Sequence, residues 1–335
     1  MHLSILVVSR TAVLISSMLN SLKDALHLPG EEVEVLCSWN GDAAEEASIE
    51  NTSGYEFLVA NRTPYHFASN MNALADKANG DVLLLINDDV VLDAHSVDAG
   101  LSCLSDHPNT GLVGARLRDH EGRLTHAGIL FDRRHSPYHQ LDRLIGSEHH
   151  AVLGEPRPVP ATTGAAMLIR REHFNALRFN SDYRVCGEDI ELCLALRQQL
   201  DLNVVYCPRF SGEHGGEATR SHQENQGGNS EDLTRIRGLH ERFLHTATRD
   251  QLRVELAASV AEADALRSLE AHRSHESQKI SEVLAQLNTL TQLKQDAENN
   301  LEIKTELNHL RDQTHALQLA RLKLEQKLKQ AERGA

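Results

Sequence analysis

The stretch Val82-Leu83-Leu84-Leu85-Ile86-Asn87-Asp88-Asp89 decides the fold class of this chain. Its first five residues are all apolar, which is typical of a strand that is covered on both faces, as in a parallel sheet. Two carboxylates directly after such a strand are costly to bury without a partner. A divalent cation is a natural partner, because hard cations prefer oxygen ligands. The alternative is that Asp88 or Asp89 caps the segment that follows.

Segments of the same kind alternate along the first part of the chain. The apolar patterns predict strands and helices in turn, with strands at 3–8, 33–37 and 55–60 and helices at 12–26 and 66–78. This βαβ rhythm predicts an α/β fold with a mostly parallel sheet and helices on both faces. Ligands of such sheets bind beyond the carboxyl ends of the strands, so we expect the site there.

The composition changes near residue 240. Residues 239–333 contain no Gly and no Pro, and strong helix formers dominate. We therefore predict a first domain at 1–240 and a long α-helical coiled-coil tail at 241–335. Apolar residues fit a and d positions in two registers, with a break between them. These residues are Ile280, Val283, Leu287, Leu290, Ala297 and Leu301, then Leu307, Leu310, Leu317, Leu324 and Leu328.

An apolar seam of this kind needs a partner to cover it. We expect self-association through the coiled coil. The alternative is a helical hairpin that folds back on itself or on the first domain.

The bulk composition excludes some function classes. The formal net charge of −14 makes nucleic-acid binding a poor expectation, although a metal ion can still bridge carboxylates to one nucleotide diphosphate. The five cysteines form no CxxC pair, which favours a reducing compartment. The pattern of the N-terminal residues predicts a buried strand and not a signal peptide. The sequence contains no run of 18 apolar residues, so it predicts no transmembrane segment. We expect a cytoplasmic protein, and the inner face of the membrane is one location that it could occupy.

Three further motifs accompany the stretch at 82–89, and together they carry a resemblance. They are the block at 160–171, the acidic motif Gly187-Glu188-Asp189-Ile190-Glu191-Leu192-Cys193, and the segment at 211–216. With Asn72 and Gly80-Asp81 ahead of the first stretch, they make residues 3–215 resemble the family 2 glycosyltransferases of the GT-A fold, especially the rhamnosyltransferase-like branch. The resemblance implies a GT-A type sheet and a nucleotide-diphosphate sugar donor.

The resemblance also implies roles for the acidic residues. Asp89 takes the place of the metal-binding carboxylate, and His214 is the expected further ligand of a divalent metal, Mn²⁺ or Mg²⁺. Asn87 and Asp88 stand where donor contacts are made, and Asn72 is placed with them.

On the acceptor side, the resemblance makes Asp189 the expected general base and Glu188 a ligand of the acceptor, while Glu191 replaces the usual Asp and is expected to be structural. The simpler interpretation is that Glu188 and Asp189 favour the positive end of a helix, and both can hold. Gly164 in the block at 160–171 would let the backbone approach a sugar, or it makes an ordinary tight turn.

The nucleobase is expected to meet the loops after the first two strands. Ser9 and Arg10 follow the first strand, and Trp39-Asn40-Gly41-Asp42 follows the second. The family commonly has D-N-x-S at the second place, so this sequence departs from the pattern. Asn40 is the expected base contact and Trp39 offers a stacking face, whereas the alternative is a plain turn around Asn40-Gly41.

Three other features receive weaker interpretations. We assign no chemistry to His126. The histidine-rich stretch at 133–150 is expected to be a solvated, mobile acceptor loop, and the alternative is a metal site. Arg220 is a candidate contact to the diphosphate.

The resemblance implies an inverting, metal-dependent transfer of a sugar to a hydroxyl of a glycan or lipid-linked saccharide, in cell-surface polysaccharide synthesis. The sequence contains no QxxRW motif, so a single, non-processive addition is expected. The alternative is a non-catalytic, sugar-nucleotide-binding scaffold that acts through its coiled coil. A nucleotidyltransferase would need a Gly-rich, Lys-bearing phosphate loop near the N-terminus, which the sequence lacks.

Overall fold

The computed structural model describes residues 2–107, 109–215, 229–298 and 304–333. The chain divides into two units, Met1–Val260 and Ala261–Ala335. The division falls inside one helix, α8 (Arg249–Glu298), and the composition break near residue 240 falls inside the helix before it, α7 (Asn229–Thr246). The functional boundary that we placed at residue 240 stays a prediction.

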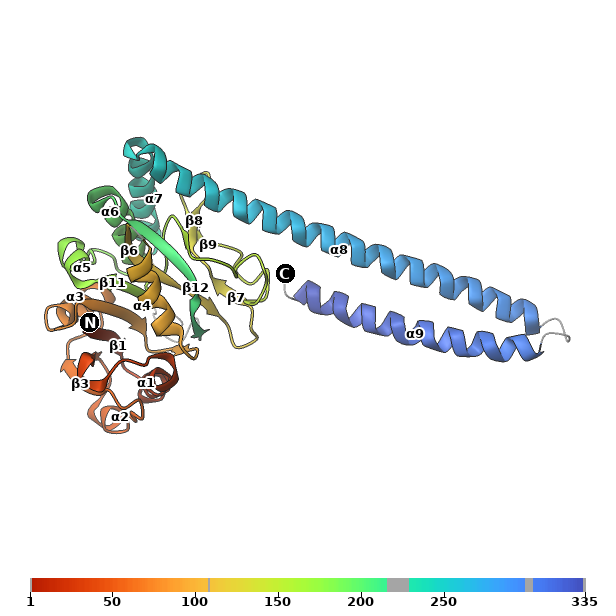
Figure 1. Ribbon diagram of the computed structural model, residues 1–335, viewed down its shortest axis with the longest axis horizontal. Coiled ribbons are helices and arrows are strands. Elements are labelled where there is room, and N and C mark those ends of the chain that lie inside the picture. The colour runs from red at the N-terminus through yellow and green to blue at the C-terminus, as the bar shows by residue number, and fades with distance from the viewer. Residues whose placement is uncertain (1, 108, 216–228, 299–303, 334–335) are drawn as a thin grey trace. The chain divides into compact units, whose positions relative to one another are not determined.

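The first unit contains one large sheet with ten described strands, in the order β10-β12-β6-β11-β4-β1-β2-β3, with β5 paired to β12 and β7 to β6 (Figure 1). The strands and helices of this unit before α7 are β1 (Leu3–Ser9), α1 (Ala12–Ala25), η1 (Gly30–Glu32), β2 (Val33–Trp39), α2 (Ala43–Ala47), β3 (Glu56–Asn61), α3 (Phe67–Ala75), β4 (Val82–Asn87), β5 (Val90–Leu92), α4 (Ser96–Asp106), β6 (Thr110–Arg118), β7 (Leu124–His126), β8 (Ile129–Phe131), β9 (Pro137–His139), β10 (Arg157–Pro158), β11 (Ala166–Arg170), α5 (Arg171–Leu177), α6 (Glu188–Leu200) and β12 (Asn203–His214).

The strand directions confirm the α/β class with a mostly parallel sheet. Strand β1 runs parallel to β2 and β4, and β2 runs parallel to β3. Strand β11 is antiparallel to both β4 and β6, so β6 and its parallel partner β12 point the same way as β4. The register pairs Ser9 with Trp39 and Val8 with Asn87, which brings the carboxyl ends of β1, β2 and β4 to one edge.

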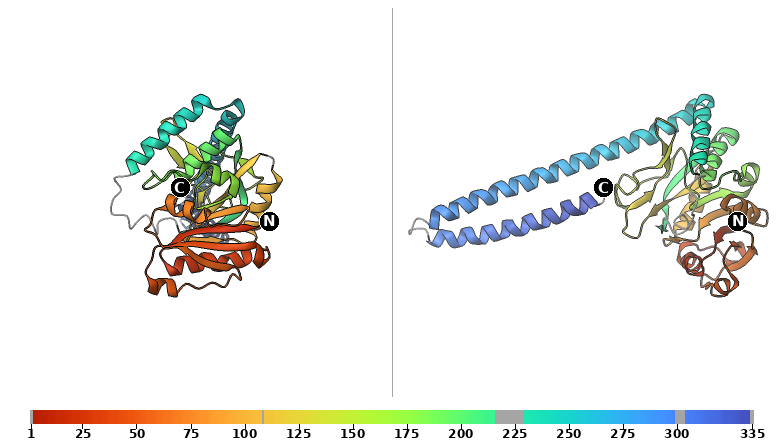
Figure 2. Two further views of the ribbon diagram at one scale, coloured as in Figure 1. Left: turned by 90° about the vertical axis from the view of Figure 1, so that its left-hand side faces the viewer. Right: turned by 180° about the vertical axis from the view of Figure 1, so that it is seen from behind.

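Helices cover both faces of this sheet. Successive side chains of each strand point to opposite faces, so each face has apolar side chains that pack against helices. Ile5, Leu84 and the equivalent residues of β2 lie in the same buried cluster as Ile15 and Leu19 of α1 and Leu101 of α4. Met71 and Leu74 of α3 are buried outside that cluster, and α3 contacts β1, β2 and β3. Figure 2 shows the helices on the two sides of the sheet.

The second unit consists of the rest of α8 and of α9 (Lys304–Arg333). In both side views these helices run next to one another (Figures 1 and 2), and Ala265 and Leu287 on α8 are buried. A helical tail is confirmed, whereas its self-association and the alternative of a helical hairpin both stay predictions. None of the helices in the described ranges has the length and apolar character needed to cross a membrane.

Candidate functional site

A cleft of about 350 Å³ opens at the edge where the parallel strands end. Residues from many places in the chain line it, among them the end of β1, the start of α3, the end of β4, β7, the loop after β9, the turn before β11, the first turn of α6 and the end of β12. Eight of the ten residues that the sequence proposed for the site lie on its walls. They are Ser9, Arg10, Asn87, Asp88, Asp89, Glu188, Asp189 and His214.

Ser9 and Asp88 meet because β1 and β4 are neighbours in register. The Ser9 hydroxyl donates a hydrogen bond of 2.7 Å to Asp88 Oδ2, and both residues are buried. Burial raises the pKa of Asp88 to about 6; the hydrogen bond from Ser9 opposes this, and the neighbouring charge of Asp89 adds to it. The Asp88 side chain therefore lines the cleft in a position that the hydrogen bond from Ser9 fixes.

Asp89 and His214 meet through a separate ladder. Strand β12 pairs antiparallel with β5, and this pairing sets His214 opposite Val90, the residue after Asp89. The backbone N–H of Gly215 also donates to the carbonyl of Asp89 at 3.1 Å. As a result, His214 Nε2 lies 3.3 Å from Asp89 Oδ1 at the floor of the cleft.

The atoms of this pair fit a divalent cation. Asp89 Oδ1 is buried and has no hydrogen-bond partner among the residues that the structure describes, although His214 Nε2 is close. Two ligands at right angles on a cation at about 2.1 Å lie about 3 Å apart, close to the separation seen here. One carboxylate with one imidazole leaves most of the coordination shell of a divalent cation for water and phosphate oxygens.

Asp189 also lines the cleft, in the first turn of α6. Its Oδ2 accepts a 2.7 Å hydrogen bond from the backbone N–H of Gly164, and its Oδ1 accepts one of 2.8 Å from the N–H of Ile190. Each carboxylate oxygen has a second lone pair, so both can still accept a proton or a hydroxyl. The Gly164 turn thus holds the carboxylate at the end of the helix.

Two proposed site residues lie elsewhere. The Asn72 amide bonds at both ends to the backbone of Phe179, donating at 2.8 Å and accepting at 3.0 Å. It joins α3 to the segment after α5 and does not line the cleft. Asn40 also lies off the cleft wall, and its Nδ2 donates to the carbonyl of Thr63.

The structure corrects the prediction that Trp39 offers a stacking face to the nucleobase. Its side chain packs in the sheet core with 2% of its surface exposed, and Nε1 donates to the carbonyl of Asp42 at 3.1 Å. An indole buried in this way has no face for a nucleobase. The apolar alternation of β2 extends to this position, and that is why the ring points inward.

Several cleft residues were not assigned to the site from the sequence, and three polar ones come from a single stretch. His139, Asp142 and Arg143 line the cleft from the stretch that we expected to be a mobile acceptor loop. The stretch is anchored by the β8–β9 hairpin and by backbone bonds such as Arg143 N–H to the carbonyl of Leu124, 2.7 Å. Their polarity was visible in the sequence, but only tertiary contacts place them in the cleft.

The other expectations can be located as well. His126 is fully buried, and burial first, then the nearby imidazoles of His139 and His214, lowers its pKa well below the usual range. Its Nε2 lies 2.8 Å from the Thr162 hydroxyl, which places it behind the cleft wall. Glu191 accepts two hydrogen bonds from Asn180. Arg220 lies outside the described residues.

No family model matches the chain. It is 32% identical over 141 residues to the O-antigen biosynthesis protein RfbC of Myxococcus xanthus, which covers 41% of this chain and 11% of that protein. It is 28% identical over 188 residues to the uncharacterized protein y4gI of Sinorhizobium fredii, covering 52% and 20%. The chain thus spans about a tenth to a fifth of the length of these relatives.

Among solved structures, S. aureus TarS 1–349 in complex with UDP-GlcNAc superposes with a TM-score of 0.54 at 14% identity, covering 79% of this chain and 72% of that one. Another S. aureus TarS structure gives a TM-score of 0.50 at 12% identity, covering 79% and 43%. The chain has the GT-A fold. At this level of identity the likeness concerns the GT-A fold alone, so the chemistry has to be argued from the side chains in the cleft.

Proposed function

We propose that this protein transfers a sugar from a nucleotide-diphosphate sugar to a hydroxyl group of a glycan or lipid-linked acceptor, in a metal-dependent reaction that inverts the anomeric centre. The observation that carries the proposal is the arrangement of Asp89, His214 and Asp189 around one cleft of a GT-A sheet. Carboxylates from separate elements that line one cleft suit a reaction that needs charge neutralisation at the leaving group and a base at the attacking hydroxyl.

On the donor side, Ser9, Arg10 and Asp88 form the wall at the ends of β1 and β4. Arg10 is exposed and brings a positive charge beside the acidic residues, which suits a diphosphate. Asp89 and His214 would hold the cation, and the cation would neutralise the negative charge that develops on the diphosphate leaving group.

On the acceptor side, Asp189 would accept the proton of the attacking hydroxyl. Its carboxylate is fixed by Gly164 and Ile190, so it does not need to be ordered when the acceptor binds. Glu188 lines the cleft beside it and would orient the acceptor. Attack on the side of the anomeric carbon opposite to the leaving group inverts its configuration.

The comparison with relatives supports one class of acceptor. The printed name of RfbC assigns that protein to O-antigen biosynthesis, and it shares 32% identity over 141 residues. An acceptor that belongs to a growing surface polysaccharide is the corresponding proposal for this chain. The absence of a QxxRW motif supports one addition per encounter.

A panel of sugar nucleotides, each with Mn²⁺, tests the proposal. We expect at least one donor to raise the melting temperature in the presence of the metal, and to be hydrolysed slowly or transferred to an added hydroxyl acceptor. Asp189→Asn should keep metal-dependent donor binding but lose about 100-fold to 10,000-fold in rate, the usual contribution of a general base. Asp89→Asn should lose both the metal-dependent donor binding and the transfer activity. Asp106→Asn, on an exposed side chain of α4, is the matched control.

Full activity of both Asp89→Asn and Asp189→Asn would show that the site is wrongly assigned. If a donor binds but is neither hydrolysed nor transferred, the protein acts as the sugar-nucleotide-binding scaffold described above. The anomeric configuration of the product, read by NMR, decides between inversion and retention.

A further inference from the structure

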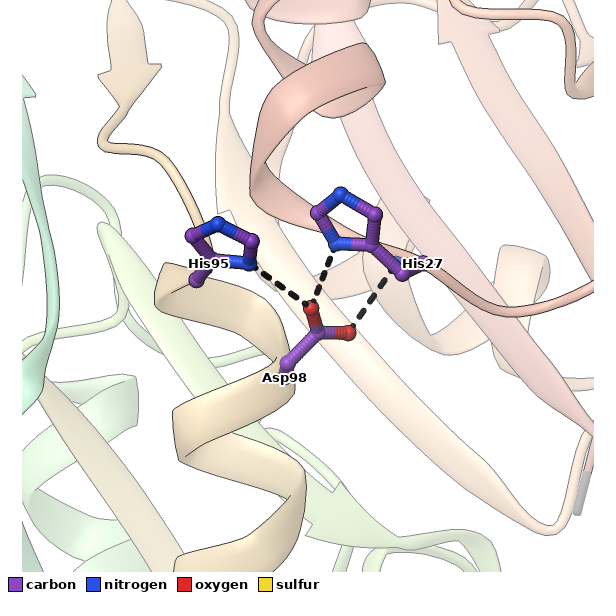
Figure 3. Close-up of side chains that lie close together, drawn as sticks. All are labelled: His27, His95 and Asp98. Atoms are coloured by element: carbon purple, nitrogen blue, oxygen red, sulfur yellow. Dashed lines mark hydrogen bonds and ion pairs between the residues drawn. The ribbon is translucent and has the colours of Figure 1, made fainter.

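A second cluster of metal-binding side chains lies away from the cleft, between α1 and α4. His27 follows the C-terminal end of α1, and His95 and Asp98 lie at the N-terminal end of α4 (Figure 3). Their ligand atoms all lie within 4.8 Å of one another, the one such group of three within the described ranges. None of the three lines the cleft.

The two imidazoles point their Nδ1 atoms at the same carboxylate (Figure 3). Asp98 Oδ2 lies 2.7 Å from His27 Nδ1 and 3.8 Å from His95 Nδ1. Tetrahedral Zn²⁺ with bonds of about 2.0–2.1 Å separates its ligand atoms by about 3.3 Å, between these two distances. The side chains of His27 and His95 are 53% and 70% exposed, so small rotations can equalise the two distances.

An ordinary helix cap does not account for His95. It stands at the N-cap of α4 but makes no side-chain capping bond. Instead its ring lies against the ring of His27, with centroids 4.5 Å apart and planes 17° apart. Asp98 needs only one imidazole as a hydrogen-bond partner, and His27 already supplies it. The second ring is thus unexplained by capping and has the position of a further ligand.

Backbone bonds hold the three residues independently of their rings. The His27 N–H donates to Asp98 Oδ1 at 3.0 Å, and the His95 N–H donates to the carbonyl of Asp24 at 2.8 Å. His95 is left-handed, with φ of 60°. The ligands therefore come from two helices that are already joined, and little order would be lost when an ion binds.

The donor set selects the kind of ion. Two imidazoles and one carboxylate suit Zn²⁺ and similar transition metals, whereas Mg²⁺ prefers oxygen ligands throughout. We propose that His27, His95 and Asp98 form a surface zinc site that joins α1 to α4. On binding, His27 and His95 are neutral imidazoles that carry their proton on Nε2, so that each Nδ1 gives its lone pair to Zn²⁺, Asp98 gives a carboxylate oxygen, and a water molecule takes the fourth position.

The test is zinc binding by the full chain without a polyhistidine tag, measured by isothermal titration calorimetry and by melting temperature. All variants carry Asp89→Asn, so that the cleft does not contribute and a failed transfer assay has no bearing on the result. We expect one equivalent of zinc, a rise in melting temperature with zinc but not with magnesium, and weaker binding at pH 5.5, where imidazoles are protonated.

Adding His95→Asn should weaken zinc binding at least about tenfold, because one of three protein ligands is lost. Asn tolerates the left-handed backbone, so the helix start is kept. The control is His120→Asn, which removes a histidine that also lies beside a carboxylate, that of Glu121, and whose side chain is 80% exposed. Equal zinc affinity of the His95→Asn variant and its parent would overturn the proposal, and so would a parent that binds no zinc.

Discussion

Removing Glu255 should destabilise the first unit, because it would leave a buried charge without its partner. Arg197 belongs to α6, the helix that carries Asp189, and is 2% exposed. Its guanidinium donates to Glu255 Oε1 at 2.6 Å, to the Pro160 carbonyl at 2.9 Å and to the Gln251 carbonyl at 3.0 Å. Glu255 comes from the first turns of α8, so this pair fastens the start of the long helix to α6.

The size of the effect follows from burial. Removing one partner of a buried ion pair costs about 3–5 kcal/mol. The Glu255 side chain is 17% exposed, so Glu255→Ala should lie near the lower end, at about 3 kcal/mol. Ala is the best helix former, so the backbone of α8 adds no penalty. Glu255→Gln keeps an acceptor for Arg197 without the charge and should cost about half as much.

Urea unfolding monitored by tryptophan fluorescence measures these values, since the chain has one Trp and Trp39 is buried in the first unit. With m near 3 kcal/mol/M, a loss of 3 kcal/mol lowers the midpoint by about 1 M. Glu241→Ala, on an exposed position of α7, is the control and should stay within about 0.5 kcal/mol. A loss below 1 kcal/mol for Glu255→Ala would refute the reasoning.

The pH dependence gives a second check on the same pair. Burial alone would raise the pKa of Glu255, but His240 and Arg197 outweigh it and hold the pKa below the ordinary value of 4.5. A depressed carboxyl pKa stabilises the fold above the unfolded-state value, and this stabilisation is lost as the pH falls through the folded-state value. The gap between wild type and Glu255→Gln should therefore be constant above about pH 5 and should close below pH 4.5.

Three further predictions follow from the contacts. His214→Ala should raise the Mn²⁺ concentration needed for half-maximal activity by about tenfold or more, with rescue at high metal; an unchanged metal titration would remove His214 from the site. Gly114→Ala would put a Cβ 2.0 Å from Thr162 Oγ1 and should cost about 1–3 kcal/mol in urea unfolding, whereas Gly146→Ala, with nothing nearer than 3.9 Å, should cost far less. Asn72→Ala should lose about 2 kcal/mol of stability while the Kd of the donor stays the same; the reverse result would restore the sequence-based role.

The sequence predicted well what depends on local pattern. The expected helices at 12–26 and 66–78 correspond to α1 and α3, and the strand at 82–86 to β4, within a few residues. The apolar run before Asp88 and Asp89 can be buried only in a covered sheet, so the carboxylates had to emerge at its edge. The resemblance placed Asp189 and His214, and the structure puts both on the same cleft.

The misses have a different physical origin. Asn72 and its partner Phe179 are 107 residues apart in sequence, so nothing near Asn72 signals that its amide is already satisfied. The position of Arg143 depends on a hairpin that is not part of the main sheet. The prediction for Trp39 was wrong for another reason. We expected an aromatic ring at a strand end to contact a ligand, but burying so large an apolar surface in the core stabilises the fold more.

Asp88 and Asp89 show why adjacency in sequence does not make two carboxylates equivalent. They follow one strand end, but Asp88 meets the Ser9 hydroxyl on the β1 side, and Asp89 meets His214, which arrives on β12. Asp88 has a hydrogen-bond donor, and burial raises its pKa toward neutrality. Asp89 keeps a buried oxygen that no described donor satisfies. A buried acceptor without a donor costs about 1–3 kcal/mol, and a cation shared with His214 would offset that cost at Asp89 only. The strand that each side chain faces therefore determines which carboxylate of the pair is hydrogen-bonded and which one has an oxygen left for a cation.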